Sequence, residues 1–183
     1  MSFFIGDKNF DDAVMYNILE GIDFYSGTER KKMLNVSDKV GGSMLYGNTW
    51  KGFLKRDSEG NKIYRPRDPN WPCRYLTKVK SENPELAGIF KEYADKYFPG
   101  FEYKQVQMNK NYPCPPHNDK NKGDSILVAF GEYTGGNLVI QKENKNIEYD
   151  GRLSPIRFNG KNYLHWVLPF SGGDRYSLVF FNN

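Results

Sequence analysis

The second half of the chain is a series of short strand-like segments, and this pattern limits the folds that the sequence can adopt. From residue 101 onward, apolar and aromatic runs alternate with turns rich in Gly, Asn and Asp. The expected strands are 101–108, 125–130, 137–140, 147–149, 154–158, 164–168 and 176–181. Short strands and turns at this spacing favour an antiparallel sandwich or small barrel.

The first half is expected to supply helices that pack outside this β structure. Residues 11–22 and 81–98 carry apolar side chains at helical spacing, and Ser81 is expected to cap the second helix. Residues 57–61 are expected to turn a short hairpin in the irregular segment between them. The sequence therefore predicts a mainly β, α+β protein: residues 1–100 as helical and loop support, and residues 101–183 as the β core.

Length and composition restrict the class of protein further. At 183 residues the chain is most simply one domain. It has no apolar run near the roughly 18 residues of a membrane helix, and its first residues lack a signal peptide. We therefore expect an intracellular protein, cytoplasmic or nuclear. Cys73 and Cys114 are expected to be free thiols, although Cys114 stands three residues before a histidine and could be a metal ligand.

The chain has only two histidines, and a carboxylate accompanies the first. If the segment His117-Asn118-Asp119 is a strand, its first and third side chains face the same side and can bind one ion. His165, in a later apolar segment, would complete two histidines and one carboxylate, the ligand set of facial non-haem Fe(II) sites. The alternatives are a polar surface loop at 114–122 and a core histidine bonded to a backbone carbonyl.

A late arginine extends this pattern. Arg175 and Ser177 are expected to face one side of the last strand, where both can bind a single carboxylate. The planar fork of arginine matches a carboxylate with two hydrogen bonds. A surface ion pair is the alternative, but the flanking Tyr176 and the apolar run 178–181 place Arg175 in a segment expected to be buried.

Together, His117-x-Asp119, His165 and Arg175-x-Ser177 resemble the Fe(II)- and 2-oxoglutarate-dependent dioxygenases over residues 101–183. The resemblance implies a double-stranded β-helix core of the jelly-roll, cupin-like kind. It implies that the two histidines and Asp119 are catalytic iron ligands, and that Arg175 with Ser177 holds the 5-carboxylate of 2-oxoglutarate, with O2 as the other co-substrate. The carboxylate at position 119 favours hydroxylation over halogenation.

Finer motifs are similar to the TET/JBP-like branch, which contains the methylcytosine and thymine hydroxylases. They lie at 109–111, 116–119, 123–125, 131–138 and 165–170. The resemblance implies hydroxylation of a (methyl)pyrimidine base in nucleic acid or a nucleotide. The prolyl-hydroxylase group also has a Gly-Gly turn before a strand, so a protein side-chain hydroxylase is the alternative. Tyr112 stands where some nucleobase oxidisers have a second arginine.

Polar residues before the first histidine are candidates for the cavity entrance. Gln107, Asn109 and Tyr112 are expected to contact either the 1-carboxylate of 2-oxoglutarate or the substrate. The alternative explanation is the ordinary polarity of a strand.

The stretch 50–80 is the candidate surface for DNA or RNA. Between residues 51 and 80, nine Lys or Arg accompany three acidic residues. Aromatic residues alternate with these cations, and such a mixture suits phosphates and bases: Trp50, Phe53, Tyr64, Trp71 and Tyr75. The alternative is a solvated face above packed aromatics. A non-catalytic barrel that binds metal or nucleic acid, or a cupin that binds metal without 2-oxoglutarate, is the alternative of another class.

Overall fold

A six-stranded antiparallel sheet organises the structure, a computed structural model that describes residues 2–24, 41–49, 53–64 and 75–182. The strands of this sheet follow the order β10-β6-β13-β5-β1-β4. Their bounds are β1 Gly42–Thr49, β4 Tyr75–Leu76, β5 Gln105–Lys110, β6 Lys122–Phe130, β10 Ile156–Phe158 and β13 Tyr176–Asn182.

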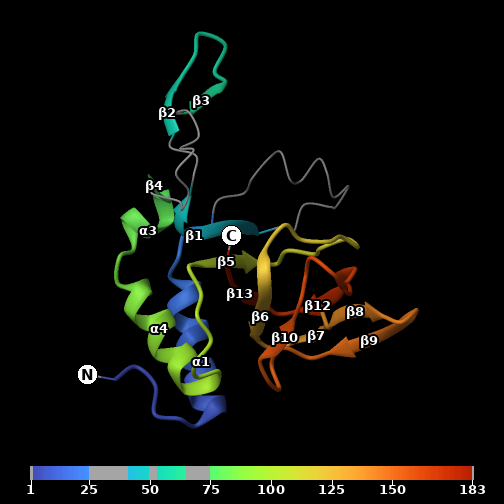
Figure 1. Ribbon diagram of the computed structural model, residues 1–183. Helices are drawn as coiled ribbons and strands as arrows, with labels where there is room; N and C mark the ends of the chain where they lie inside the picture. Colours follow the sequence, from blue (N-terminus) through green and yellow to red (C-terminus); the bar gives the residue numbers. More distant parts are fainter. Residues whose placement is uncertain (1, 25–40, 50–52, 65–74, 183) are drawn as a thin grey trace.

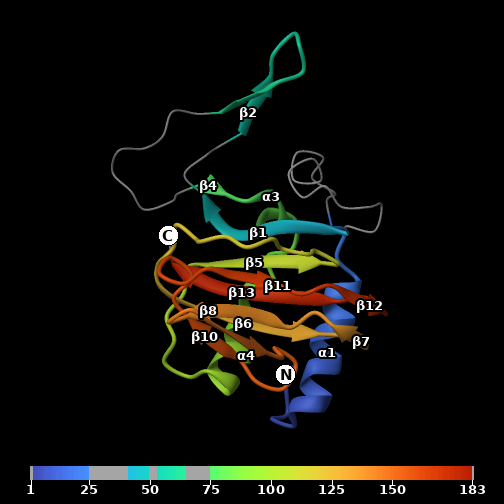
Figure 2. The same ribbon diagram turned by 90° about the vertical axis from the view of Figure 1, so that its right-hand side faces the viewer.

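Smaller sheets complete the β structure. The first joins β8 (Leu138–Lys142), β9 (Lys145–Tyr149) and β11 (His165–Val167), and the second joins β7 (Tyr133–Gly135) and β12 (Phe170–Gly172). Figures 1 and 2 show that α1 and α4 cover one face of the six-stranded sheet, and that the smaller sheets lie on its other face. This arrangement confirms the predicted fold, a mainly β protein of antiparallel sheets with helices packed outside.

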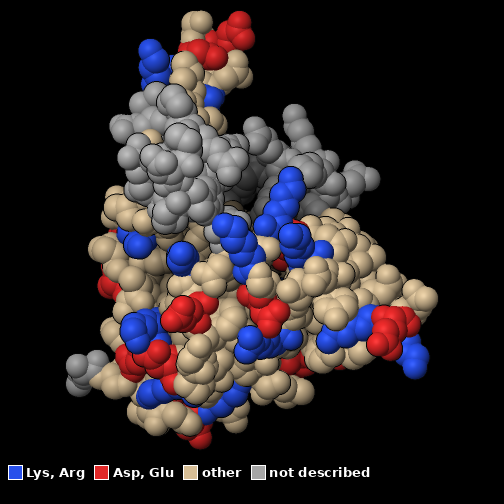
Figure 3. All heavy atoms as spheres, viewed as in Figure 1, with Lys and Arg blue, Asp and Glu red and all other residues tan. Residues whose placement is uncertain are grey.

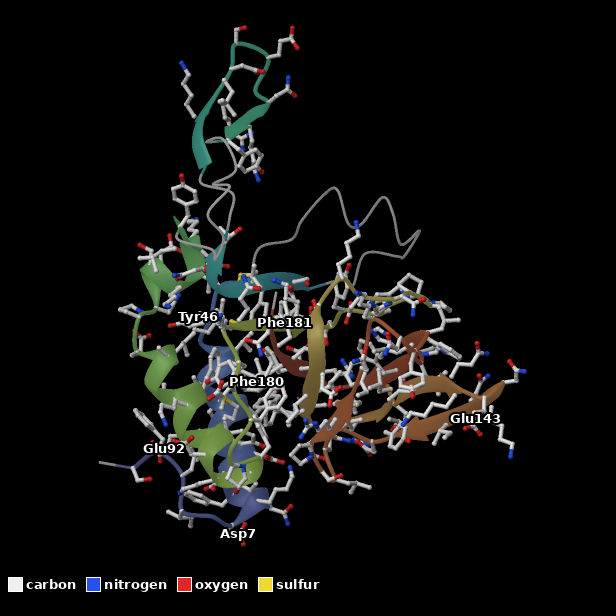
Figure 4. All side chains as sticks on the ribbon, in the orientation of Figure 1. Asp7, Tyr46, Glu92, Glu143, Phe180 and Phe181 are labelled. Carbon is white, nitrogen blue, oxygen red and sulfur yellow. The ribbon has the colours of Figure 1, made fainter. Side chains whose placement is uncertain are left out.

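The alternation of side chains along β13 explains why the two faces differ. Tyr176, Leu178 and Phe180 are buried in the aromatic core beneath the helices. Ser177 and the other intervening side chains instead line a cavity on the opposite face. Neighbouring strands β5 and β6 alternate in the same way, as period-two geometry requires. Phe180 and Phe181, labelled in Figure 4, are neighbours in sequence that belong to opposite faces.

The helices differ from their predicted bounds at their starts. The first, α1, spans Lys8–Glu20, and Asp7 caps it by accepting a hydrogen bond from the Phe10 amide. The predicted helix 81–98 is two helices, α3 (Lys78–Glu82) and α4 (Leu86–Tyr97). Thr77 caps α3, so the prediction of Ser81 as a cap is wrong. The break follows from the proline at position 84, because the residue before a proline is disfavoured in the α conformation.

Two strands of the main sheet, β1 and β4, come from the segment between the predicted helices, which was expected to be irregular. The eight residues of β1 pair with β5 from Gly42 opposite Lys110 to Gly47 opposite Gln105. A Cβ atom at Gly41 would lie 2.8 Å from the Lys110 carbonyl oxygen, so glycine permits the close approach there. The β structure therefore includes strands from both sides of residue 101.

The predicted hairpin at 57–61 is confirmed. It joins β2 (Phe53–Arg56) to β3 (Lys62–Tyr64), and Figure 1 shows it standing apart from the sheets. Asp57 Oδ1 accepts hydrogen bonds from the backbone amides of Glu59 and Asn61, which fixes the turn. None of the helices in the described ranges has the length and apolar character that a membrane crossing needs.

Candidate metal centre

Three side chains from two segments that are far apart in sequence converge in the wall of the cavity. One ligand atom from each of His117, Asp119 and His165 lies within 4.8 Å of the other two. The two carboxylate oxygens divide between the histidines: Oδ1 is 3.4 Å from His117 Nε2, and Oδ2 is 3.6 Å from His165 Nε2. Such spacing leaves room for one ion bound by all three groups, two histidines and one carboxylate.

Backbone contacts orient both imidazole rings. His117 Nδ1 lies 2.8 Å from the Pro115 carbonyl oxygen, and His165 Nδ1 lies 3.0 Å from that of Tyr163. A carbonyl only accepts, so each Nδ1 carries the proton and each Nε2 is the atom directed at the carboxylate. An anchored second nitrogen is the usual arrangement for a metal-binding histidine.

The local structure around His117 is not the strand on which the spacing argument for His117 and Asp119 was conditional. His117 forms an isolated antiparallel bridge with His165, with two backbone hydrogen bonds of 3.0 Å. Asp119 lies outside the strands, and its amide donates to the Gly160 carbonyl oxygen at 2.8 Å. The two side chains therefore do not project from one strand, and the loop alternative holds for this segment. Pairing with the segment of His165 brings the ligands together instead.

Protonation of the two histidines differs because their surroundings differ. Hydrogen bonds to Asp119 and to Cys114 raise the pKa of His117 to about 10. Burial lowers the pKa of His165, because desolvation disfavours the imidazolium form. A metal ligand has to be deprotonated, so binding of a cation would release the proton that His117 shares with Asp119.

Cys114 stands beside the site and outside the converging group. Its Sγ lies 3.4 Å from His117 Nδ1 and 3.7 Å from His117 Nε2. Among the described residues, the group whose ligand atoms converge comprises the two histidines and Asp119. The structure thus places Cys114 as a neighbour of a ligand, in the wall of the cavity.

Arg175 lies behind the cavity wall, with its side chain buried at 1% exposure. Its Nη1 is 3.4 Å from Ser177 Oγ, and its Nε, also buried, has no hydrogen-bond partner among the residues that the structure describes. No carboxylate of the described part of the chain forms an ion pair with it. Burial lowers the pKa of Arg175 because the charged form is desolvated. The guanidinium group therefore has hydrogen-bonding capacity that these neighbours leave unused.

Aromatic rings and glycines hold this arginine in place. The guanidinium carbon is 5.6 Å from the ring centroids of both Tyr133 and Phe170, within the range of a cation–π contact. A Cβ atom at Gly136 would lie 2.9 Å from Arg175 Nε, so glycine provides space for the arginine at the turn before β8. Arg152 also packs on Tyr133, with its guanidinium carbon 4.3 Å from the ring centroid.

The metal-site residues and Ser177 open into one cavity of about 490 Å³. The predicted entrance residues Gln107, Asn109 and Tyr112 all line it. Ser43 links two of them: its Oγ donates to Asn109 Oδ1 at 2.7 Å and accepts from Gln107 Nε2 at 2.9 Å. Asn109 Nδ2 in turn donates to Ser177 Oγ at 3.3 Å. A chain of neutral polar groups therefore connects the entrance to Arg175.

Two residues near Asp119 were not predicted from the sequence. Asn121 Nδ2 lies 3.2 Å from Asp119 Oδ2 and 3.2 Å from the buried Ser125 Oγ. Gly160 packs directly against the same carboxylate. The Gly160 contact depends on the path of a distant loop, and the Asn121 contact depends on how its own loop turns back on Asp119. Neither residue carries a motif that sequence reasoning could have used.

The donor set fits the cofactors that the sequence resemblance implies. Imidazole nitrogens and a carboxylate suit Fe(II), and three ligands leave positions for exchangeable groups. The unpartnered Nε of the buried arginine, together with the Ser177 hydroxyl, suits one carboxylate of 2-oxoglutarate. These residues therefore fit both Fe(II) and 2-oxoglutarate.

The candidate nucleic-acid stretch 50–80 is described only in part. Trp50, Trp71 and the arginines at 65, 67 and 74 lie outside the described residues. Within the β2–β3 hairpin, Lys55, Arg56 and Lys62 are exposed, and Tyr64 is 42% exposed. On the face in Figure 3, basic and acidic side chains are interspersed over the described surface.

The chain is structurally similar to solved 2-oxoglutarate–Fe(II) oxygenases. NgTET1 in complex with 5mC DNA shares 18% identity, covering 91% of this chain and 68% of that chain, with a TM-score of 0.49. A 2OG-Fe(II) oxygenase family oxidoreductase from Burkholderia pseudomallei shares 17% identity over 73% of this chain and 72% of that chain, with a TM-score of 0.38. A prolyl-4-hydroxylase from Pseudomonas putida shares 18% identity over 57% and 66%, with a TM-score of 0.35.

These similarities concern the fold alone. The substrates named for those proteins are not assigned to this chain on that basis. No family model matches the chain. A search of the curated proteins also finds no match. The structure itself shows a His-x-Asp…His triad within a fold of antiparallel sheets.

Proposed function

We propose that this protein is an Fe(II)- and 2-oxoglutarate-dependent dioxygenase that hydroxylates a C–H bond of a (methyl)pyrimidine base in nucleic acid or a nucleotide. The observation that carries the proposal is the meeting, in one cavity, of the triad and of Ser177. The Ser177 hydroxyl contacts a buried arginine that forms no ion pair with a carboxylate in the described ranges. When bound, Fe(II) and 2-oxoglutarate supply an O2-dependent oxidation of a C–H bond, with succinate and CO2 as co-products.

The chain's own residues would bind and orient these reactants. His117, Asp119 and His165 hold the cation, and the two backbone-anchored Nδ1 atoms keep both rings in position. Arg175 and Ser177 bind the 5-carboxylate of 2-oxoglutarate at the far end of the cavity. Apolar side chains exclude water from the space between: Leu127, Leu138, Phe158 and Val179.

The remaining cavity wall supports a planar, polar-edged substrate. Tyr112 and Trp166 offer aromatic faces for stacking, while Gln107 and Asn109 offer amides that both donate and accept. A pyrimidine has a flat ring with donors and acceptors on its edge. The volume lies within the roughly 300–1,000 Å³ typical of small-molecule sites, which suits one base beside 2-oxoglutarate.

The described surface supports unpaired nucleic acid. A base in a duplex would have to leave the stack to enter this cavity, at a cost of a few kcal/mol that a single strand avoids. The hairpin cations Lys55, Arg56 and Lys62 can contact phosphates, and the mixed charge over the face in Figure 3 favours local contacts over a broad electrostatic footprint.

The first experiment tests the oxygenase assignment. Fe(II) and 2-oxoglutarate are titrated together into the protein without oxygen, and the visible charge-transfer band of the chelate is followed. We expect a band in the wild-type protein and none in Asp119→Ala. A wild type without a band, or an unaltered band in Asp119→Ala, would show that the assignment is wrong.

The second experiment tests the substrate. Single-stranded and duplex oligonucleotides that contain methylated or unmethylated pyrimidines are incubated with the loaded enzyme, digested and analysed by mass spectrometry. We expect an added oxygen atom on a pyrimidine, with more product from single strands. Succinate formation without any oxidised nucleoside would support the oxygenase activity and rule out a pyrimidine base as the substrate. Oxidised proline-containing peptides would then identify a side-chain hydroxylase.

A further inference from the structure

Gly160 lies in the turn between β10 and β11, directly under the carboxylate of Asp119. A Cβ atom built on Gly160 would lie 2.3 Å from Asp119 Oδ2, 3.0 Å from its Cγ and 3.2 Å from its Cβ. These are the three nearest heavy atoms to that position, and all belong to Asp119. The φ angle of Gly160 lies outside the left-handed region, so the position needs a small residue for space and not for conformation.

Hydrogen bonds tie the same turn to the segment that carries Asp119. The Asp119 amide donates to the Gly160 carbonyl oxygen at 2.8 Å, and Asn118 Nδ2 donates to the Lys161 carbonyl oxygen at 3.3 Å. The backbone of Asp119 is therefore fixed against the turn. The closest approach leaves the carboxylate no freedom to move toward Gly160.

Asn121 restrains the carboxylate through a hydrogen bond. Its Nδ2 lies 3.2 Å from Asp119 Oδ2 and 3.2 Å from Ser125 Oγ. Ser125 belongs to β6 and is completely buried, so Asn121 links the carboxylate to the rigid main sheet. The oxygen that Asn121 contacts is the one that faces His165.

We propose that Gly160 and Asn121 are positioning residues that hold the Asp119 carboxylate with one oxygen toward each histidine. The inference rests on the proposed function, because it assigns these two residues to the metal site. Gly160 provides the space that the carboxylate occupies, and Asn121 fixes its rotation. Any side chain at position 160 would turn Oδ2 away from His165 Nε2 and open the ligand set. Partners behind metal ligands typically contribute about 10- to 100-fold in affinity.

Metal affinity is the first measurement, with Co(II) as a spectroscopic probe that needs neither oxygen nor substrate. Gly160→Ala is compared with Gly151→Ala, because Gly151 is another buried glycine, whose Cβ would meet Leu127 Cδ2 at 2.8 Å. We expect Gly160→Ala to weaken Co(II) binding at least 10-fold and to change the Co(II) absorption spectrum. Gly151→Ala should lose thermal stability and retain the wild-type affinity.

A double-mutant cycle in the metal-free protein tests the contact itself. Asp119→Ala removes the two closest crowding atoms, Oδ2 and Cγ, and keeps the Cβ at 3.2 Å. Gly160→Ala should therefore lower the melting temperature markedly in the wild-type background and much less in the Asp119→Ala background. An equal loss in both backgrounds would overturn the inference. If Gly160→Ala alone does not fold, the double variant should still fold, and Asn121→Ala should weaken Co(II) binding several-fold at unchanged melting temperature.

The outcomes separate this inference from the proposed function. A wild type that binds no Co(II) overturns both. A wild type that binds Co(II) with a Gly160→Ala variant of equal affinity and spectrum overturns the positioning role alone and leaves the metal site in place. Loss of affinity in Gly160→Ala and Asn121→Ala, with Gly151→Ala unaffected, supports the assignment.

Discussion

Two buried charges lie on opposite sides of the main sheet, and their surroundings differ. Asp11, on the helical side, is 0% exposed and accepts hydrogen bonds from the amides of Ile5 and Gly6, at 2.8 Å each. The Tyr97 hydroxyl also donates to it at 2.6 Å. Arg175, on the cavity side, has a hydroxyl and two aromatic rings around it, with Nε unpartnered.

The difference is the one expected between a structural charge, Asp11, and the ligand-binding charge that we propose for Arg175. A buried charge is costly unless its partners replace the lost water. The partners of Asp11 come from the N-terminal arm and from α4, so its charge joins these parts to α1. The partners of Arg175 are neutral, and none cancels its charge. An anion that enters the cavity would supply the negative charge and the hydrogen-bond acceptor that Arg175 lacks among the described residues. A protein that buries such an unpaired charge gives up some stability of the unbound state and gains affinity for the ligand.

The largest effect is expected for Arg175→Met. Each lost charge-assisted hydrogen bond is worth about 1.5–3 kcal/mol, so 2-oxoglutarate binding should weaken by a factor on the order of 100 or more, by 1.4 kcal/mol per tenfold. The free energy of unfolding should stay near that of the wild type or rise, because an apolar chain of similar length replaces an unpaired charge. Calorimetric titration and urea unfolding measure the two effects. Arg157→Ala, which removes an exposed arginine paired with Asp124, is the control and should bind 2-oxoglutarate normally.

Asp11→Asn should give the opposite pattern. The amide has one acceptor oxygen where the carboxylate has two, so at least one of its three donors loses its partner. Leaving one buried donor unsatisfied costs about 1–3 kcal/mol. We expect the free energy of unfolding in urea to fall by this amount while the affinity for 2-oxoglutarate is unchanged. A variant with lower affinity and wild-type stability would contradict the separation of the two regions.

Tyr133 offers a smaller test of how Arg175 is held. A desolvated cation–π contact is worth up to about 2 kcal/mol, so Tyr133→Leu should weaken 2-oxoglutarate binding roughly tenfold. Tyr133→Phe keeps the ring and should lose less. Equal losses in the two variants would show that the hydroxyl, and not the aromatic face, orients the guanidinium. Calorimetric titration of 2-oxoglutarate distinguishes the two cases.

Features that depend on residue type and order could be predicted from the sequence. The triad and Arg175-x-Ser177 were predictable because a ligand set is defined by residue type and order. Most strands after residue 101 were predictable because their apolar runs end at glycine turns, whereas the short strands β7 and β12 were not predicted. Their bounds shifted by a few residues, as with β5, which begins at Gln105 where position 101 was expected.

Features that depend on distant neighbours were not predictable. The first strand, β1, has glycines at both ends of its paired segment and little alternation, and it is a strand only because β5 lies beside it. Gly160 is an ordinary loop residue until the fold brings it to Asp119, and Asn121, two residues from Asp119, gains its role only when the fold brings its amide to the buried Ser125. Asp11 was expected near the start of a helix, but its burial was not predictable. It is buried because the N-terminal arm, through Ile5, and α4, through Tyr97, pack against it.

The smallest expected effect is the pH dependence of the Asp11 contribution. Burial opposes ionisation of Asp11, but hydrogen bonds from Tyr97 and from the amides of Ile5 and Gly6 outweigh it and lower its pKa below the ordinary value of 3.8. A carboxyl group whose pKa is lowered by folding stabilises the protein above its unfolded-state pKa. That contribution is lost as the pH falls through the folded-state pKa.

Urea unfolding of the wild type and Asp11→Asn at pH 7, 5 and 3 measures this contribution. The difference in free energy of unfolding should be constant between pH 7 and 5, and it should narrow at pH 3, because protonation of Asp11 makes the wild type resemble the variant. Other carboxyl groups with lowered pKa values, such as Asp150 and Asp174, titrate in both proteins and cancel in the difference. A difference that widens toward pH 3 would mean that the Asp11 charge opposes folding, and the contrast with Arg175 would then fail.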